Sequence, residues 1–235
     1  MRSFRFAAAF FLTGLVCATA QITLNPSPTR VIGQTSTTLF GVSPNLVEGR
    51  EFQQPSSVVV DGSTSPAPVY VSDTGNNRVL GFRSATGFTN GQFADIVIGQ
   101  PDFVTTFSQG PTNTSSTRST GLTSPRGLAV DNSGNLYVID AGNNRILRFP
   151  KPFTQTANEL PDMVIGQPGF STGGANQGGI SASTLSFAGA SSVGLTFDSA
   201  GNLWVADSGN NRVLRFNASA LGAQPKSNPS ADVVL

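Results

Sequence analysis

The sequence predicts an all-β fold: a β-propeller of four-stranded antiparallel blades, with about three blades present. The decapeptide DTGNNRVLGF at residues 73–82 recurs as DAGNNRILRF at 140–149 and DSGNNRVLRF at 207–216, each copy 67 residues after the last. Apolar runs of four to six residues accompany every copy, and such runs are typical of strands because they are too short for helices. Turn residues separate the runs, so each unit is predicted to be one antiparallel meander.

Each unit contains four apolar runs in a fixed order. The first ends in an aspartate, as in GLAVD up to Asp131; the second is of the type LYVI, and the third follows the sequence GNN. The fourth contains VIGQP in the first two units and is ADVVL in the third. Between the first two runs, DNSGN and DSAGN supply Gly and Asn, which tolerate the positive φ of a tight hairpin. We expect Gly142, in the turn between the second and third runs, to adopt positive φ as well. A lone copy of the fourth run, RVIGQT, begins at Arg30.

The second runs indicate how the meanders are arranged. In LYVI and LWVA neighbouring positions are both apolar, so both faces of these strands require burial. Radial stacking of four-stranded sheets buries both faces and produces a β-propeller. A parallel β-helix is the alternative repeat architecture, but its coils are much shorter than this unit and the hairpin turns argue against it.

The segment PRGLAVDNSGNLYVIDAGNNRILRF at residues 125–149 resembles an NHL repeat. The resemblance covers three units and the lone leading run. It implies that the four runs are strands a to d, counted outward from the propeller axis, and that the b–c turns share one face with the d–a connections. Two departures occur: the first unit has the longer turn DGSTSPAP in place of Asp-x-x-Gly-Asn, and the third has Ser192 where the others have Pro55 and Pro125.

The amino terminus is predicted to be a secretory signal peptide. Residues 1–20 contain the basic start MRSFR, the apolar run FAAAFFLTGLV and the small residues ATA before Gln21. A membrane anchor would need about 20 apolar residues, so we expect an extracellular or periplasmic protein that is free of the membrane after cleavage. The remaining predicted units are a propeller at 21–235, an outer strand at 30–33, and blades at about 52–100, 122–167 and 190–235.

Composition excludes several functions for the mature chain. Without Arg2 and Arg5, 12 of the 14 basic side chains remain against 13 acidic ones, which gives no electrostatic footprint for nucleic acid. The chain contains no histidine, the commonest metal ligand and general base. A single Asp-rich turn supplies too few oxygens for calcium. We therefore predict no catalytic residue, no metal and no cofactor in this sequence, and we expect binding rather than catalysis.

The repeated polar residues are the candidate binding site. Their functional interpretation is a ring of ligand-binding groups around the axis. Their structural interpretation, which we favour, is a capped turn in which each Asp accepts backbone N–H bonds and pairs with the Arg five positions later. A group present in every repeat is expected to serve the repeat itself. The candidates are Asp73, Asn76, Asn77, Arg78, Asp140, Asn143, Asn144, Arg145, Asp207, Asn210, Asn211 and Arg212.

Two functional classes remain open. The first is an extracellular binding or scaffold propeller whose long polar d–a loops, such as residues 101–125, contact a protein, peptide or glycan. The second is a lyase-like or lactonase-like propeller enzyme whose catalytic residues lie in blades beyond residue 235. Three blades cannot close a propeller, which needs about four to eight. We expect a longer protein, or else a homodimer in which residues 30–33 complete the partner's last blade.

Overall fold

The computed structural model describes residues 28–39, 47–109, 120–155, 159–187, 192–222 and 226–235. The expected signal peptide at 1–20 lies outside these residues. Among the residues described, no helix is long and apolar enough to cross a membrane.

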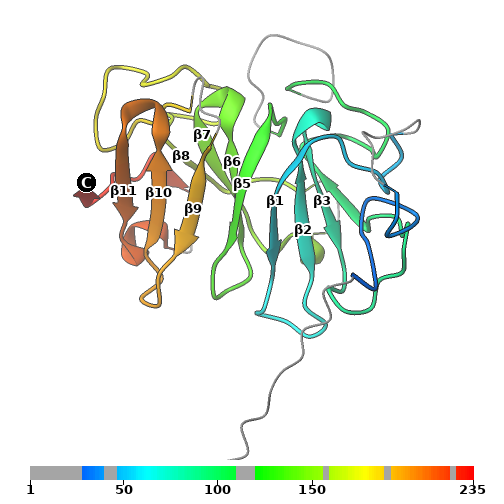
Figure 1. Ribbon diagram of the computed structural model, residues 1–235. Coiled ribbons are helices and arrows are strands. Elements are labelled where there is room, and N and C mark those ends of the chain that lie inside the picture. The colour runs from blue at the N-terminus through cyan, green and yellow to red at the C-terminus, as the bar shows by residue number, and fades with distance from the viewer. Residues whose placement is uncertain (1–27, 40–46, 110–119, 156–158, 188–191, 223–225) are drawn as a thin grey trace, which may run out of the picture.

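Three sheets stand side by side, each containing an antiparallel meander of four strands (Figure 1), which confirms the all-β partial propeller. Blade 1 consists of β1 (Pro55–Val60), β2 (Val69–Asp73), β3 (Arg78–Phe82) and β4 (Ile96–Ile98). Blade 2 consists of β5 (Pro125–Val130), β6 (Leu136–Asp140), β7 (Arg145–Phe149) and β8 (Met163–Ile165). Blade 3 consists of β9 (Gly194–Phe197), β10 (Leu203–Asp207), β11 (Arg212–Phe216) and β13 (Val233–Val234).

Blade 2 differs from the predicted four-stranded pattern because a fifth strand joins its outer edge. This strand, β12 (Lys226–Ser227), pairs in parallel with β8. Beyond it, the N–H of Asn228 donates to the carbonyl of Val164 at 2.7 Å. The outer edge of β8 offers open backbone donors and acceptors, which a passing segment can pair with.

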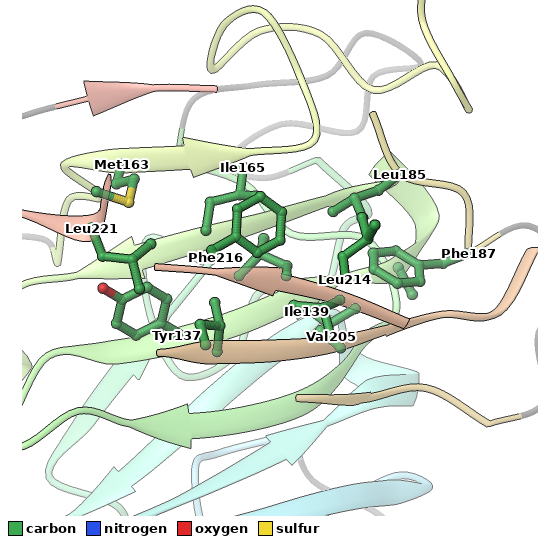
Figure 2. Packing of buried hydrophobic residues seen from close by; sticks show 13 residues of the cluster. Tyr137, Ile139, Met163, Ile165, Leu185, Phe187, Val205, Leu214, Phe216 and Leu221 are labelled. Carbon is green, nitrogen blue, oxygen red and sulfur yellow. The ribbon is translucent and has the colours of Figure 1, made fainter. Parts of the chain in front are cut away.

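The blades pack face to face through apolar side chains. One cluster joins blade 1 to blade 2, and a second joins blade 2 to blade 3 (Figure 2). In the second, the rings of Tyr137 and Phe197 meet edge to face with centroids 5.0 Å apart. Every residue of β6 and β7 is buried. Stacking on both sides therefore provides the two-sided burial that the LYVI pattern requires.

The face of blade 3 that points away from blade 2 is more open. Val213 is 37% exposed, whereas Ile146, its counterpart in blade 2, is fully buried. Val213 therefore lacks the cover that the neighbouring blade gives to Ile146.

The outer strand predicted at 30–33 is not a strand. The glycine of each VIG sequence has positive φ: +92° at Gly33, +91° at Gly99 after β4, and +90° at Gly166 after β8. Residues 30–33 therefore keep the local conformation of the other two copies. An outer strand pairs with the third strand of its own blade, and among the described residues no such strand stands beside 30–33. Instead, Ile32 packs with Phe52 in the cluster on the outer face of blade 1.

Candidate functional site

The repeated Asp-x-Gly-Asn-Asn-Arg segments form the b–c turns, which connect the second strand of each blade to the third. Each turn contains a short 3₁₀ segment: η1 (Thr74–Asn76), η2 (Ala141–Asn143) or η4 (Ser208–Asn210). The next residue is an asparagine in the left-handed region, with φ of 53° at Asn77, 49° at Asn144 and 54° at Asn211. Asparagine enters this region more readily than most residues, so the turn closes on Asn.

Gly142 is not among the described glycines with positive φ, so the expectation for it is wrong. This glycine is needed for a different reason. Its N–H donates to the carbonyl of Thr123 at 2.9 Å, and a Cβ on it would lie 2.4 Å from Thr123 Cγ2. Gly75 and Gly209 make the same hydrogen bond in the other blades. The glycine lets the b–c turn contact the segment that enters the first strand.

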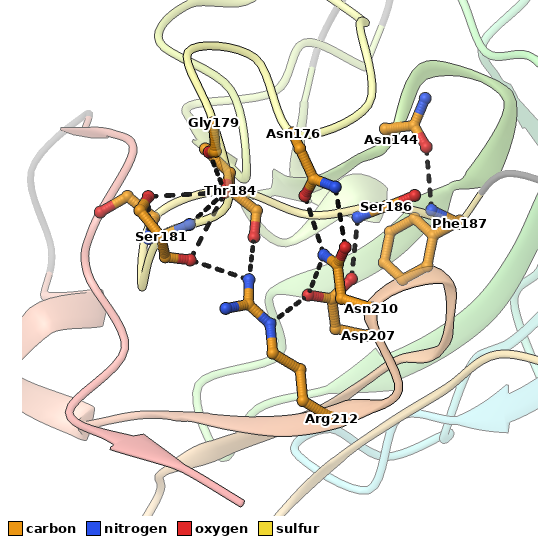
Figure 3. A network of polar contacts seen from close by, with 11 residues as sticks. Asn144, Asn176, Gly179, Ser181, Thr184, Ser186, Phe187, Asp207, Asn210 and Arg212 are labelled. Atoms are coloured by element: carbon orange, nitrogen blue, oxygen red, sulfur yellow. Dashed lines mark hydrogen bonds and ion pairs between the residues drawn. The ribbon is translucent and has the colours of Figure 1, made fainter.

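The aspartate of each turn is buried and accepts hydrogen bonds with both carboxylate oxygens. In blade 2, Asp140 Oδ1 accepts from the N–H of Thr123 at 2.7 Å, and Oδ2 accepts from Asn143 Nδ2 at 2.8 Å and Arg145 Nε at 2.7 Å. The turns of blades 1 and 3 repeat these contacts, and Figure 3 shows those of blade 3. Burial raises the pKa of the Asp140 carboxyl, and the charge of Arg145 and the hydrogen bonds offset only part of this effect.

The arginine of each turn reaches the d–a loops. Arg145 Nη1 donates to the carbonyl of Phe170, in the loop leaving blade 2, and Nη2 donates to that of Gly121 at 2.9 Å, in the loop entering it. In blade 3, Nη2 of Arg212 donates to the carbonyls of Ser181 at 2.8 Å and Thr184 at 2.7 Å (Figure 3). A guanidinium has five donors in a fixed plane, so one side chain ties a turn to its loops.

The second asparagine of the turn adds a further tie between neighbouring blades. Asn144 Oδ1 accepts from the N–H of Phe187 at 2.8 Å, and Nδ2 donates to the carbonyl of Gly173 at 3.0 Å. Asn77 makes the equivalent pair of bonds one blade earlier. Both asparagines therefore fix the path of the loop that leads to the next blade.

The structure thus places all twelve predicted residues at the b–c turns, in one set of four per blade. Their contacts give them a structural part in the fold, and the binding part predicted for them stays a prediction. Asn211 is exposed, and Asn77, Asn210 and Arg212 are partly exposed. The buried members are Asp73, Asn76, Arg78, Asp140, Asn143, Asn144, Arg145 and Asp207.

Sequence reasoning missed two sets of loop residues. Gln167 Nε2 donates to the carbonyls of Asn144 at 3.0 Å and Gly174 at 2.8 Å, and Gln100 repeats this pattern in blade 1. The repeated sequence VIGQP, which contains both glutamines, could have identified them. In addition, the Asn176 and Asn210 amides bond reciprocally at 2.7 and 2.8 Å, and Gln109 pairs with Asn143 at the corresponding position. This second set had no signal in residue type, because Gln stands in one loop and Asn in the other.

The a–b turns lie on the opposite face and are closed by their own aspartates. Asp131 Oδ1 accepts from the N–H groups of Ser133 at 2.9 Å and Asn135 at 3.0 Å, and Oδ2 accepts from Asn135 Nδ2 at 2.8 Å. Bonds from Trp204 and Asn202 lower the pKa of Asp198 to about 2. In the part of the chain that the structure describes, no group of three or more His, Cys, Asp or Glu side chains could hold a metal ion.

Comparison with known proteins identifies NHL repeats at residues 122–149 and 193–216. A search of curated proteins gave no match. Similar solved structures include a streptogramin B lyase, with 14% identity and a TM-score of 0.38 over 71% of this chain and 38% of that one. Another is a virginiamycin B lyase from Staphylococcus aureus, with 13% identity and a TM-score of 0.35 over 71% of this chain and 53% of that one. The chain spans about half of these structures or less, and likeness at this level carries no argument about activity.

The family match falls on corresponding parts of two blades. It covers β5, β6 and β7 of blade 2 and β9, β10 and β11 of blade 3, with the b–c turn of each. Blade 1, which has the divergent turn DGSTSPAP, lies outside the matched residues. The chain therefore contains two matched NHL repeats, one in its second blade and one in its third.

Proposed function

We propose that this chain is an extracellular binding or scaffold propeller that presents its d–a loops to a protein, peptide or glycan partner. The observation that supports this function is that the loops leaving blades 1 and 2 are anchored to the b–c turns and yet expose large apolar side chains. Val104 and Ile180 are each 66% exposed, and Phe107 is 46% exposed.

The anchoring bonds lie next to the exposed side chains. Asn77 Nδ2 donates to the carbonyl of Thr106 at 3.0 Å, and Gln100 Nε2 donates to that of Phe107 at 2.7 Å. An ordered loop loses little conformational entropy on binding. Aromatic residues are enriched at the centres of protein interfaces. The anchored loops therefore combine a fixed backbone with side chains suited to contact a partner.

Binding is tested by probing glycan and peptide arrays with the purified chain and a V104S/F107S/I180S variant. We expect hits on the arrays that the variant loses, because it removes apolar contacts and leaves the anchoring bonds in place. The matched control is V60S/L160S, which removes side chains that are 51% and 50% exposed outside these loops. A lack of any hit, or hits that the loop variant keeps, would refute this function.

The extracellular setting rests on the basic and apolar residues at the amino terminus. Export with cleavage after Ala20 is expected to produce a protein that begins at Gln21. Amino-terminal sequencing of the protein recovered from the medium or periplasm checks this result. Recovery in the cytoplasm with residues 1–20 intact would contradict it.

A further inference from the structure

A pocket of about 300 Å³ lies between blades 1 and 2, on the face opposite the b–c turns. Its walls are the a–b turns of the two blades and the short 3₁₀ segment η3 (Pro152–Thr154). Asp61 and Tyr70 of blade 1 line it, together with Lys151 and Phe153 of blade 2. The pocket is thus separate from the loops assigned to binding above.

Asp61 carries a carboxylate oxygen without a partner. The residue is 4% exposed, and its Oδ1 accepts from the N–H of Ser63 at 2.9 Å. In the other blades the second oxygen of the corresponding Asp131 and Asp198 accepts from an asparagine of the same turn, at 2.8 and 2.9 Å. The turn DGSTSPAP has no asparagine, and no other described residue bonds to Asp61 Oδ2. This oxygen is therefore available to a ligand in the pocket that Asp61 lines.

Tyr70 places a second such group in the same pocket. Its side chain is 1% exposed, and its hydroxyl has no hydrogen-bond partner among the described residues. Burial and the charges of Asp61 and Glu159 raise the pKa of Tyr70. The group is therefore a neutral hydroxyl, which can both donate and accept a hydrogen bond.

The corresponding pocket between blades 2 and 3 lacks this combination. Its tyrosine, Tyr137, also has a hydroxyl without a hydrogen-bond partner, but both oxygens of its aspartate, Asp131, are used within the turn. The free carboxylate oxygen is therefore a feature of the blade 1 pocket that the repeat does not require.

The lining indicates the charge and shape of a ligand. The pocket is lined by charges of both signs. The ammonium of Lys151 repels a cation bound beside Asp61, and the carboxylate of Asp61 repels an anion. One wall is aromatic: the ring centroids of Phe153 and Tyr70 lie 5.8 Å apart, and the Arg83 guanidinium covers one face of Phe153 at 4.9 Å from the centroid. Apolar walls with a few placed polar groups are typical of small-molecule sites. A neutral ring with hydroxyl donors and an apolar face suits both the mixed charges and the aromatic wall of this pocket.

We propose that this pocket binds a neutral pyranose, with sugar hydroxyls bonded to Asp61 Oδ2 and Tyr70 Oη and a carbon face of the ring against Phe153. The proposal is independent of the loop-binding function, because the two sites use different residues on opposite faces. Failure of either one leaves the other unaffected.

The experiment is ligand-observed NMR and calorimetry with glucose, galactose, mannose and N-acetylglucosamine, each as free sugar and as methyl glycoside. We expect at least one to bind. Tyr70→Phe and Asp61→Asn should each raise its Kd about fivefold or more, because each removes or weakens one hydrogen bond. Tyr137→Phe is the matched control and should leave the Kd unchanged. Tyr70→Phe should also leave the melting temperature unchanged, since the hydroxyl bonds to none of the described residues.

Binding of methyl glycosides would show that the site can take a sugar at the end of a glycan, whereas binding of free sugars alone would restrict it to monosaccharides. Three results would overturn the proposal: none of the sugars binds, Tyr70→Phe and Asp61→Asn leave binding unchanged, or propylammonium binds in place of the sugars. The last result would identify the pocket as a cation site.

Discussion

Arg145→Met is expected to lower the free energy of unfolding by about 3–5 kcal/mol, the usual effect of removing one partner of a buried ion pair. Both Arg145 and Asp140 have fully buried side chains. The substitution leaves the Asp140 carboxylate without its counterion in a place that water does not reach. It also removes the donors to the carbonyls of Phe170 and Gly121, so each of the two loops loses a hydrogen bond to the turn.

The matched control for this change is Arg212→Met in blade 3. Its side chain is 12% exposed, whereas that of Arg145 is fully buried, so water can reach the carboxylate of Asp207 more readily once the arginine is gone. We expect a smaller loss, of about 1–2 kcal/mol. Urea unfolding followed by the fluorescence of Trp204, the single tryptophan, measures both. Equal losses in the two variants would contradict the argument that burial makes the pair sensitive.

The fold could be predicted from the sequence because the same pattern of apolar runs and turn residues occurs three times. Apolar runs of strand length, turn residues between them and two apolar faces on the second run leave few arrangements other than stacked meanders. The outer strand at 30–33 could not be predicted in the same way, because a strand depends on its partner. The sequence RVIG keeps its local conformation at Gly33, but local conformation alone does not make a sheet.

The candidate site was predictable in its positions and less so in its contacts. The Asp and Arg of each turn were expected to pair, and they do so at 2.7 Å in every blade. The amide pairs of Gln109 and Asn176 come from loops of different sequence, so no repeat marks them. The divergent turn of blade 1 was visible, but its consequence for Asp61 requires knowing that the asparagine in the other turns bonds to the aspartate.

Gly142→Ala is expected to lower the free energy of unfolding by about 1–3 kcal/mol, through overpacking rather than through backbone strain. An added Cβ would lie 2.4 Å from Thr123 Cγ2 and 2.9 Å from the Thr123 carbonyl oxygen. The turn cannot simply move away, because the N–H of Gly142 and the carboxylate of Asp140 both bond to Thr123. The same unfolding measurement reports the loss.

Two further variants separate a steric effect from a general intolerance of glycine substitution. Gly62→Ala places a Cβ with nothing within 4 Å, so it should change the stability by no more than about 0.5 kcal/mol. Thr123→Ala combined with Gly142→Ala should recover part of the loss, because the closest atom is then absent while the carbonyl oxygen remains. If Gly142→Ala costs no more than Gly62→Ala, then the turn has room for a side chain. The repeated glycine would then have to be explained by something other than contact with the strand-entry segment.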